Sequence, residues 1–149
     1  MLPPVCAPAA RAEIARVAGV AGARVALRRG ESSQATPECR FRAGAVRVTV
    51  DVDGFPQPYF RLERTAIEDE QQFGTVRLEA APQAITGVGI EAYWFPTEQK
   101  VMVTEGRRLI TVLVAWPGAW SRRRETLAKA IARRYLGPPD PGAADPNGS

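Results

Sequence analysis

Four carboxylates in one short segment are the residues of this sequence whose spacing best suits chemistry. They are Glu63, Glu68, Asp69 and Glu70. Paired carboxylates can carry acid–base catalysis or bind a hard metal ion. At helical spacing Glu63 and Glu70 share one side of a helix, whereas Glu68 and Asp69 diverge, and neighbouring arginines can neutralise them. We therefore interpret the segment as a solvated helix face, and we predict neither catalytic carboxylates nor a metal site.

The sequence contains no histidine. This removes the commonest general base, the commonest metal ligand and every triad built on histidine. Ser32, Ser33 and Ser121 therefore lack the usual base, and Ser121 fits a helix cap better. Gly87-Val88-Gly89 has no third glycine at dinucleotide-loop spacing and no P-loop lysine, so a close backbone approach or a bulge explains it better. We predict that the protein is not an enzyme and holds no cofactor.

Two cysteines, Cys6 and Cys39, lie 39 − 6 = 33 positions apart and flank the first helix-like segment. Their separation does not match the short CxxC spacing of redox or metal motifs. We favour one disulfide bond, which requires an oxidising compartment and therefore indicates export. Two unpaired buried thiols are the alternative.

An aromatic run followed by arginines is the strongest candidate for an interaction surface. It comprises Tyr93, Trp94, Phe95, Arg107 and Arg108, with Trp116 and Trp120 nearby in sequence. Strand alternation sends Trp94 to the face opposite Tyr93 and Phe95, so one of these faces is a candidate for exposure. Aromatic and arginine side chains are enriched at interface hot spots. The alternative is that helices cover both faces and all the rings belong to the core.

A second candidate lies near the C-terminal end, where the basic run Arg122–Arg124 is followed by Arg133 and Arg134. These arginines lie on one predicted helix and could face an anionic polymer or lipid headgroups. Arginine in the first turn of a helix opposes the helix dipole, which favours an external anionic partner. A solvated helix face is the alternative.

The overall composition is that of an ordinary globular domain, with 45% hydrophobic and 24% charged residues. The 20 basic and 16 acidic residues give a net charge of +4. The basic residues are spread along the chain and form no concentrated stripe, so we do not expect nucleic acid as a partner. No apolar run approaches the roughly 20 residues that a membrane-spanning helix needs.

Periodicity predicts an α+β fold with an antiparallel sheet of about five to seven strands packed with two or three helices. Short connections favour antiparallel neighbours among the last three strands. Residues 1–137 should form a single domain, and 138–149 a flexible tail rich in Pro, Gly and Ala. The predicted helices cover 8–18, 59–73 and 121–136, and the predicted strands 25–29, 39–42, 46–52, 76–78, 91–95, 101–104 and 109–116.

The element order resembles that of small exported actinobacterial domains, many of them lipoproteins, with a PsbP-like α+β sandwich. The resemblance rests on Cys6 with Glu38-Cys39-Arg40-Phe41, on Val46–Val50, on Ile85–Ala92 and on Leu127–Ala132. It implies an extracellular or cell-envelope location and a binding role, with no catalytic residues. The sequence departs from it in one respect, since Pro3-Pro4-Val5 before Cys6 is not a lipobox.

Residues 1–30 contain no continuous apolar stretch of the kind found in signal peptides, and charged residues such as Arg11 and Glu13 interrupt them. We expect a mature form with an added Met1; a start codon placed too late and a cytosolic protein are the alternatives. The sequence thus predicts a non-catalytic, exported or cell-envelope binding domain, whose partner is a protein or an anionic envelope component. The alternative is a cytosolic scaffold or accessory subunit with reduced cysteines.

Overall fold

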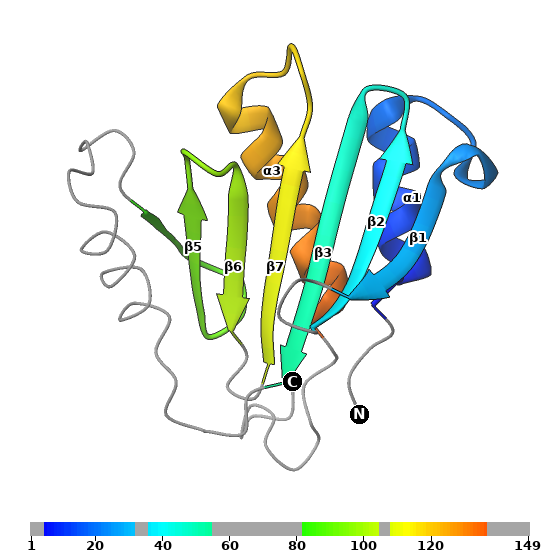
Figure 1. Cartoon of the computed structure of the whole chain (residues 1–149). Helices are drawn as coiled ribbons and strands as arrows, with labels where there is room; N and C mark the ends of the chain where they lie inside the picture. Colours follow the sequence, from blue (N-terminus) through cyan, green and yellow to red (C-terminus); the bar gives the residue numbers. More distant parts are fainter. Residues whose placement is uncertain (1–4, 32–35, 55–81, 105–107, 137–149) are drawn as a thin grey trace, which may run out of the picture.

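The computed structural model describes residues 5–31, 36–54, 82–104 and 108–136. Within these residues, seven strands form one antiparallel sheet in the order β1-β2-β3-β7-β6-β5-β4 (Figure 1). The strands are β1 Ala26–Glu31, β2 Pro37–Ala43, β3 Val46–Gly54, β4 Gln83–Ile85, β5 Glu91–Phe95, β6 Lys100–Thr104 and β7 Arg108–Ala115. The helices are α1 Pro8–Ala18, the short 3-10 helix η1 Gly22–Arg24, and α3 Ser121–Tyr135. The predicted α+β class is confirmed.

The sheet is built from two antiparallel meanders, β1–β3 and β4–β7, which join along β3 and β7. This central pairing runs from Arg47 opposite Ala115 to Gly54 opposite Arg108. The β2–β3 hairpin closes through a two-residue turn that begins at Gly44, whose φ of +60° suits glycine. The two strands of this hairpin and the β5–β7 meander were predicted from sequence, whereas the short β4 and the β3–β7 pairing were not.

Both α-helices cover the same face of the sheet, behind the strands in Figure 1. Helix α3 packs on β7 and β6, and α1 packs against α3 and β2. Alternate residues of the central strands point into this layer, as period-two patterning requires. The buried strand and helix side chains include Val48, Val50, Val52, Val101, Val103, Ile110, Val112, Val114, Leu127, Ala128 and Ile131. The opposite face is covered by neither α1 nor α3, and we call it the open face.

A disulfide joins Cys6 and Cys39, with 5.3 Å between their Cα atoms, and confirms the predicted bridge. The fully buried Tyr135 fixes the same N-terminal segment: its hydroxyl donates to the Val5 carbonyl at 2.5 Å and accepts from the Ala7 amide at 3.3 Å. Burial raises the pKa of Tyr135 to about 12. The N-terminal segment is therefore bound to both the sheet and the last residue of α3.

Gly89 lies against β6 with a φ of +62°, and a Cβ atom there would come within 2.5 Å of Val103 Cγ1. The close-approach interpretation of the glycine pair is thus confirmed at Gly89.

Several predicted features lie outside the described residues: the helix at 59–73 with its carboxylate cluster, the strand at 76–78, Ser32, Ser33 and the tail at 138–149. None of the described helices has the length and apolarity needed to cross a bilayer.

Candidate anion-binding surface

The structure corrects the predicted interaction surface, because its central aromatic rings are buried. Trp94 is 2% exposed and points into the helix-covered layer. Phe95 is 3% exposed and packs with Met102 in a second, smaller cluster on the open face, beside the half-buried Tyr93. The predicted alternation of Trp94 against its neighbours is confirmed. These rings therefore stabilise the fold and do not form an exposed patch.

Of the two arginines assigned to that surface, Arg108 lies within the described residues. Arg108 begins β7, is half-buried, and donates from Nη1 to the Tyr135 carbonyl at 3.4 Å, on the helix side of the sheet. Burial lowers the pKa of Arg108. Arg107 lies outside the described residues. Arg108 and the Tyr93–Phe95 run are thus not brought together as one patch.

Strand register instead gathers four arginines on the open face of the sheet, at the edge formed by β1, β2 and β3. Arg28 lies directly opposite Arg40, and Arg42 lies directly opposite Arg47. Arg40 and Arg42 are two positions apart on β2, so both point to this face. All four are exposed. We call Arg28, Arg40, Arg42 and Arg47 the arginine cluster.

The arginine cluster places like charges side by side, which is unfavourable in a sheet. Side chains directly opposite on antiparallel strands have Cβ atoms about 5 Å apart, and like charges at such positions destabilise the pairing. Arg40 binds Glu38 through Nε at 2.7 Å. Within the described ranges, Arg28, Arg42 and Arg47 have no ion pair. An anion bound here would relieve the repulsion, and planar guanidinium groups fit phosphate or carboxylate oxygens in bidentate fashion.

A pair of carboxyl groups adjoins the arginine cluster on the open face. Glu38 on β2 and Asp51 on β3 lie directly opposite each other, and Glu38 is 7% exposed. The pKa of Asp51 is raised to about 7, chiefly by burial. The hydrogen bond with the Glu38 carboxyl and charge repulsion from that carboxyl also raise this pKa, whereas the positive charge of Arg40 lowers it. Asp51 Oδ1 is buried and accepts no hydrogen bond from any described group. The pair is a local source of strain beside the arginines.

We expect Asp51→Asn to reduce the loss of stability as pH rises. Folding raises the pKa of Asp51 from 3.8 to about 7. Between these two pH values the native state keeps a proton that the unfolded chain has already released. The stabilising contribution is complete below pH 4 and is lost as pH rises through 7. Urea unfolding at pH 5 and pH 8 should give a smaller difference in free energy for the variant than for the wild type. Asp53→Asn, two positions along β3, is the control; an equal effect there would contradict the assignment.

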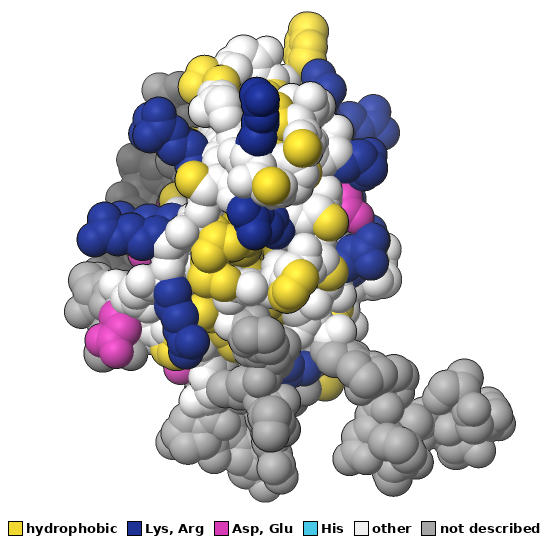
Figure 2. Space-filling model, turned by 90° about the vertical axis from the view of Figure 1, so that its right-hand side faces the viewer, with side chains coloured by type: hydrophobic (Ala, Val, Ile, Leu, Met, Phe, Trp, Pro, Cys, Tyr) yellow, Lys and Arg dark blue, Asp and Glu magenta, His cyan; other side chains and the backbone are white. Residues whose placement is uncertain are grey.

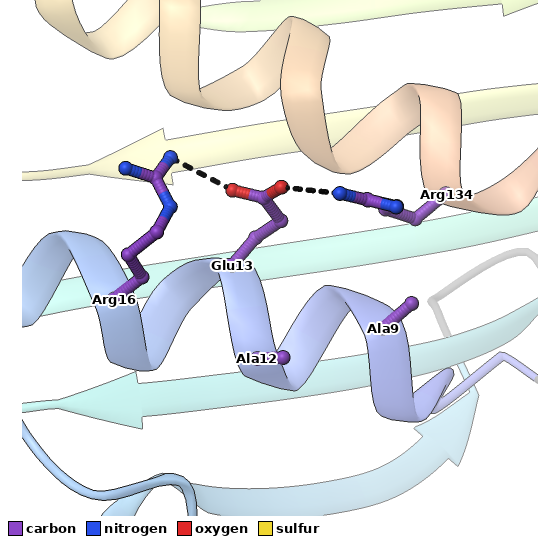
Figure 3. Close-up of a pocket in the computed structure, with 5 residues that line it drawn as sticks. All are labelled: Ala9, Ala12, Glu13, Arg16 and Arg134. Carbon is purple, nitrogen blue, oxygen red and sulfur yellow. Dashed lines mark hydrogen bonds and ion pairs between the residues drawn. The ribbon is translucent and has the colours of Figure 1, made fainter.

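A shallow hollow of about 270 Å³ lies between the two helices and is lined by Ala9, Ala12, Glu13, Arg16 and Arg134 (Figure 3). Glu13 points between the two arginines and binds Arg134 and Arg16 at 2.8 and 2.9 Å. The hydrogen bond from Arg134, followed by that from Arg16, lowers the pKa of Glu13. Because the carboxylate is already bound by two guanidinium groups, it serves as a clamp between α1 and α3.

Seen from the side of β1 (Figure 2), basic side chains project at many points of the surface with apolar atoms between them. The arginine cluster was not predicted from the sequence, because its members come from three separate strands. The available signal was the alternation in β2 and β3, which puts Arg40, Arg42 and Arg47 on one face once the hairpin register is known.

The described residues contain no group of three or more acidic or cysteine side chains that could hold a metal ion. The resemblance to exported actinobacterial domains stays a prediction. No protein-family model, curated protein or solved structure matches this chain.

Proposed function

We propose that this protein is an exported, non-catalytic domain that binds an anionic component of the cell envelope through the arginine cluster. The observation that carries the proposal is the two pairs of directly opposed arginines, Arg28 with Arg40 and Arg42 with Arg47, on an exposed sheet face. The cross-strand repulsion costs stability, and an anionic ligand offsets that cost only when it is bound.

The disulfide supports the exported location. Cys39 is fully buried in β2, and its bridge to Cys6 suits an oxidising, extracellular setting. Arginine, which stays charged at every physiological pH, keeps the surface cationic in such a setting. Both features agree with a binding domain outside the cytoplasm.

The test uses fluorescein-labelled inorganic polyphosphate as a soluble anionic probe, with binding followed by fluorescence anisotropy. We expect Arg42→Gln to weaken binding about tenfold and Arg42→Gln/Arg47→Gln to weaken it further, because each charge-assisted contact contributes roughly 1.5–3 kcal/mol. The slope of log affinity against log salt should fall by about 1 for each arginine removed.

Arg133→Gln is the matched control, since Arg133 is exposed in the last turn of α3. It makes the same charge change outside the arginine cluster and should bind polyphosphate within about twofold of the wild type. Unfolding in urea should show the cluster variants to be as stable as the wild type or slightly more stable. Equal loss of affinity in the control and in Arg42→Gln would refute the proposed surface.

A further inference from the structure

Trp120 is 83% exposed, although tryptophan is usually well buried. It follows a turn in which the Ala119 amide donates to the Trp116 carbonyl at 3.1 Å. Pro117 and Gly118, with a φ of +84° at the glycine, fit the two central positions of a type II turn. Trp120 is the residue immediately before α3, and its side chain makes no capping hydrogen bond to the helix.

Hydrogen bonds hold this turn in place, so the exposure of Trp120 is built into the fold. Arg124 donates from Nε to the Trp116 carbonyl at 3.1 Å and from Nη1 to Gln99 Oε1 at 3.2 Å. The Trp120 carbonyl accepts from the amides of Arg123 and Arg124 at 2.9 and 3.1 Å. The indole is therefore presented to solvent by a fixed backbone.

Exposed arginines follow Trp120 closely in sequence, at the start of α3. Arg122 and Arg123 are exposed in the first turn of α3, which holds no acidic residue. The Arg123 guanidinium stacks over the Trp116 ring at 4.6 Å. Positive charge at a helix N-terminus opposes the helix dipole, so an external anion would stabilise this arrangement.

The arginine cluster lies at the same end of the sheet. Arg47 is directly opposite Ala115, the residue before Trp116, and Arg42 and Arg47 flank the β2–β3 turn. In Figure 1 this turn and the connection from β7 to α3 both lie at the upper end of the molecule. One end of the domain thus combines basic residues on the open face with an exposed tryptophan behind the sheet.

We infer that the anionic partner is the surface of a lipid bilayer that contains anionic lipids, with Trp120 as the interfacial anchor; this inference rests on the proposed function. A bilayer is broad enough to touch both the open face and the start of α3. Tryptophan favours the membrane–water interface, where its ring is in an apolar layer and its N–H is hydrated. The arginines at the start of α3 are attracted to anionic headgroups, and this combination is typical of proteins that lie on a membrane surface.

The experiment measures co-sedimentation of the full chain with phosphatidylcholine vesicles that contain 30% or no phosphatidylglycerol. We expect binding to the anionic vesicles only, with a blue shift of tryptophan emission. Trp120→Ala should weaken vesicle binding about tenfold or more, because even partial burial of the ring removes a large apolar area from water. The same variant should bind polyphosphate like the wild type.

Ile90→Ala is the matched control, since Ile90 is 76% exposed and follows Gly89 in the connection to β5. It should bind vesicles like the wild type. Equal binding to vesicles without phosphatidylglycerol, or unchanged binding by Trp120→Ala, would overturn the inference. Binding of polyphosphate without any binding of vesicles overturns the inference and leaves the proposed function standing, whereas binding of neither probe overturns both.

Discussion

Cys6→Ala/Cys39→Ala is expected to lower the free energy of unfolding by about 4 kcal/mol, because the bridge closes a loop across a separation of 33 residues. In the chain-entropy account, such a loop restricts the unfolded ensemble, and losing the restriction favours unfolding. The native state is affected as well, since the bridge fixes the N-terminal segment on which Tyr135 depends for its hydrogen bonds. Urea unfolding of the variant beside the oxidised wild type measures the loss.

Reduction supplies the control for this prediction. Dithiothreitol should destabilise the wild type by a similar amount and leave the double variant unchanged, whereas an equal effect on both would show that the reductant acts elsewhere.

The oxidation state of the same two cysteines tests the proposed location. Protein isolated from its natural source under iodoacetamide, without reductant, should carry no label on Cys6 or Cys39. Labelling of both would contradict export and favour the cytosolic scaffold with reduced cysteines.

Trp94→Ala is expected to cost about 3–5 kcal/mol, which is typical of removing a large ring from a packed core. Trp94 is 2% exposed in the helix-covered layer, so the substitution leaves a cavity that the neighbouring strands fill only in part. A loss of this size leaves many domains of similar length only marginally folded. Thermal and urea unfolding should show a lower midpoint.

Trp120→Ala makes the same chemical change at a side chain that is 83% exposed, and it should alter the free energy of unfolding by no more than about 0.5 kcal/mol. The comparison therefore separates a core tryptophan from a surface one. Equal stability of the two variants would contradict the burial of Trp94 and would make Trp94 a candidate contact residue for a partner again.

The aromatic–arginine surface shows where sequence reasoning stops. Alternation correctly sends Trp94 away from its neighbours, but the same pattern is compatible with either face being exposed. Trp94 is buried because it packs into the main core on the helix-covered side of the sheet, and Phe95 is buried in the cluster with Met102 on the other side. The number of layers over a strand depends on contacts between distant segments, which local periodicity does not contain. The exposed tryptophan is Trp120, held by the turn before α3.

What the sequence by itself determined was mainly local. The apolar spacing of α1 and α3 and the alternation in β2, β3 and β5–β7 follow from neighbouring side chains, and the pairing of the two cysteines was inferred from their number and spacing. Tertiary structure alone decided that β3 pairs with β7, because joining two meanders depends on the contacts of residues far apart in sequence. It also decided that arginines spread along the chain meet at one place: register aligns Arg28 with Arg40 and Arg42 with Arg47, and a shift of one residue would have turned them to the other face.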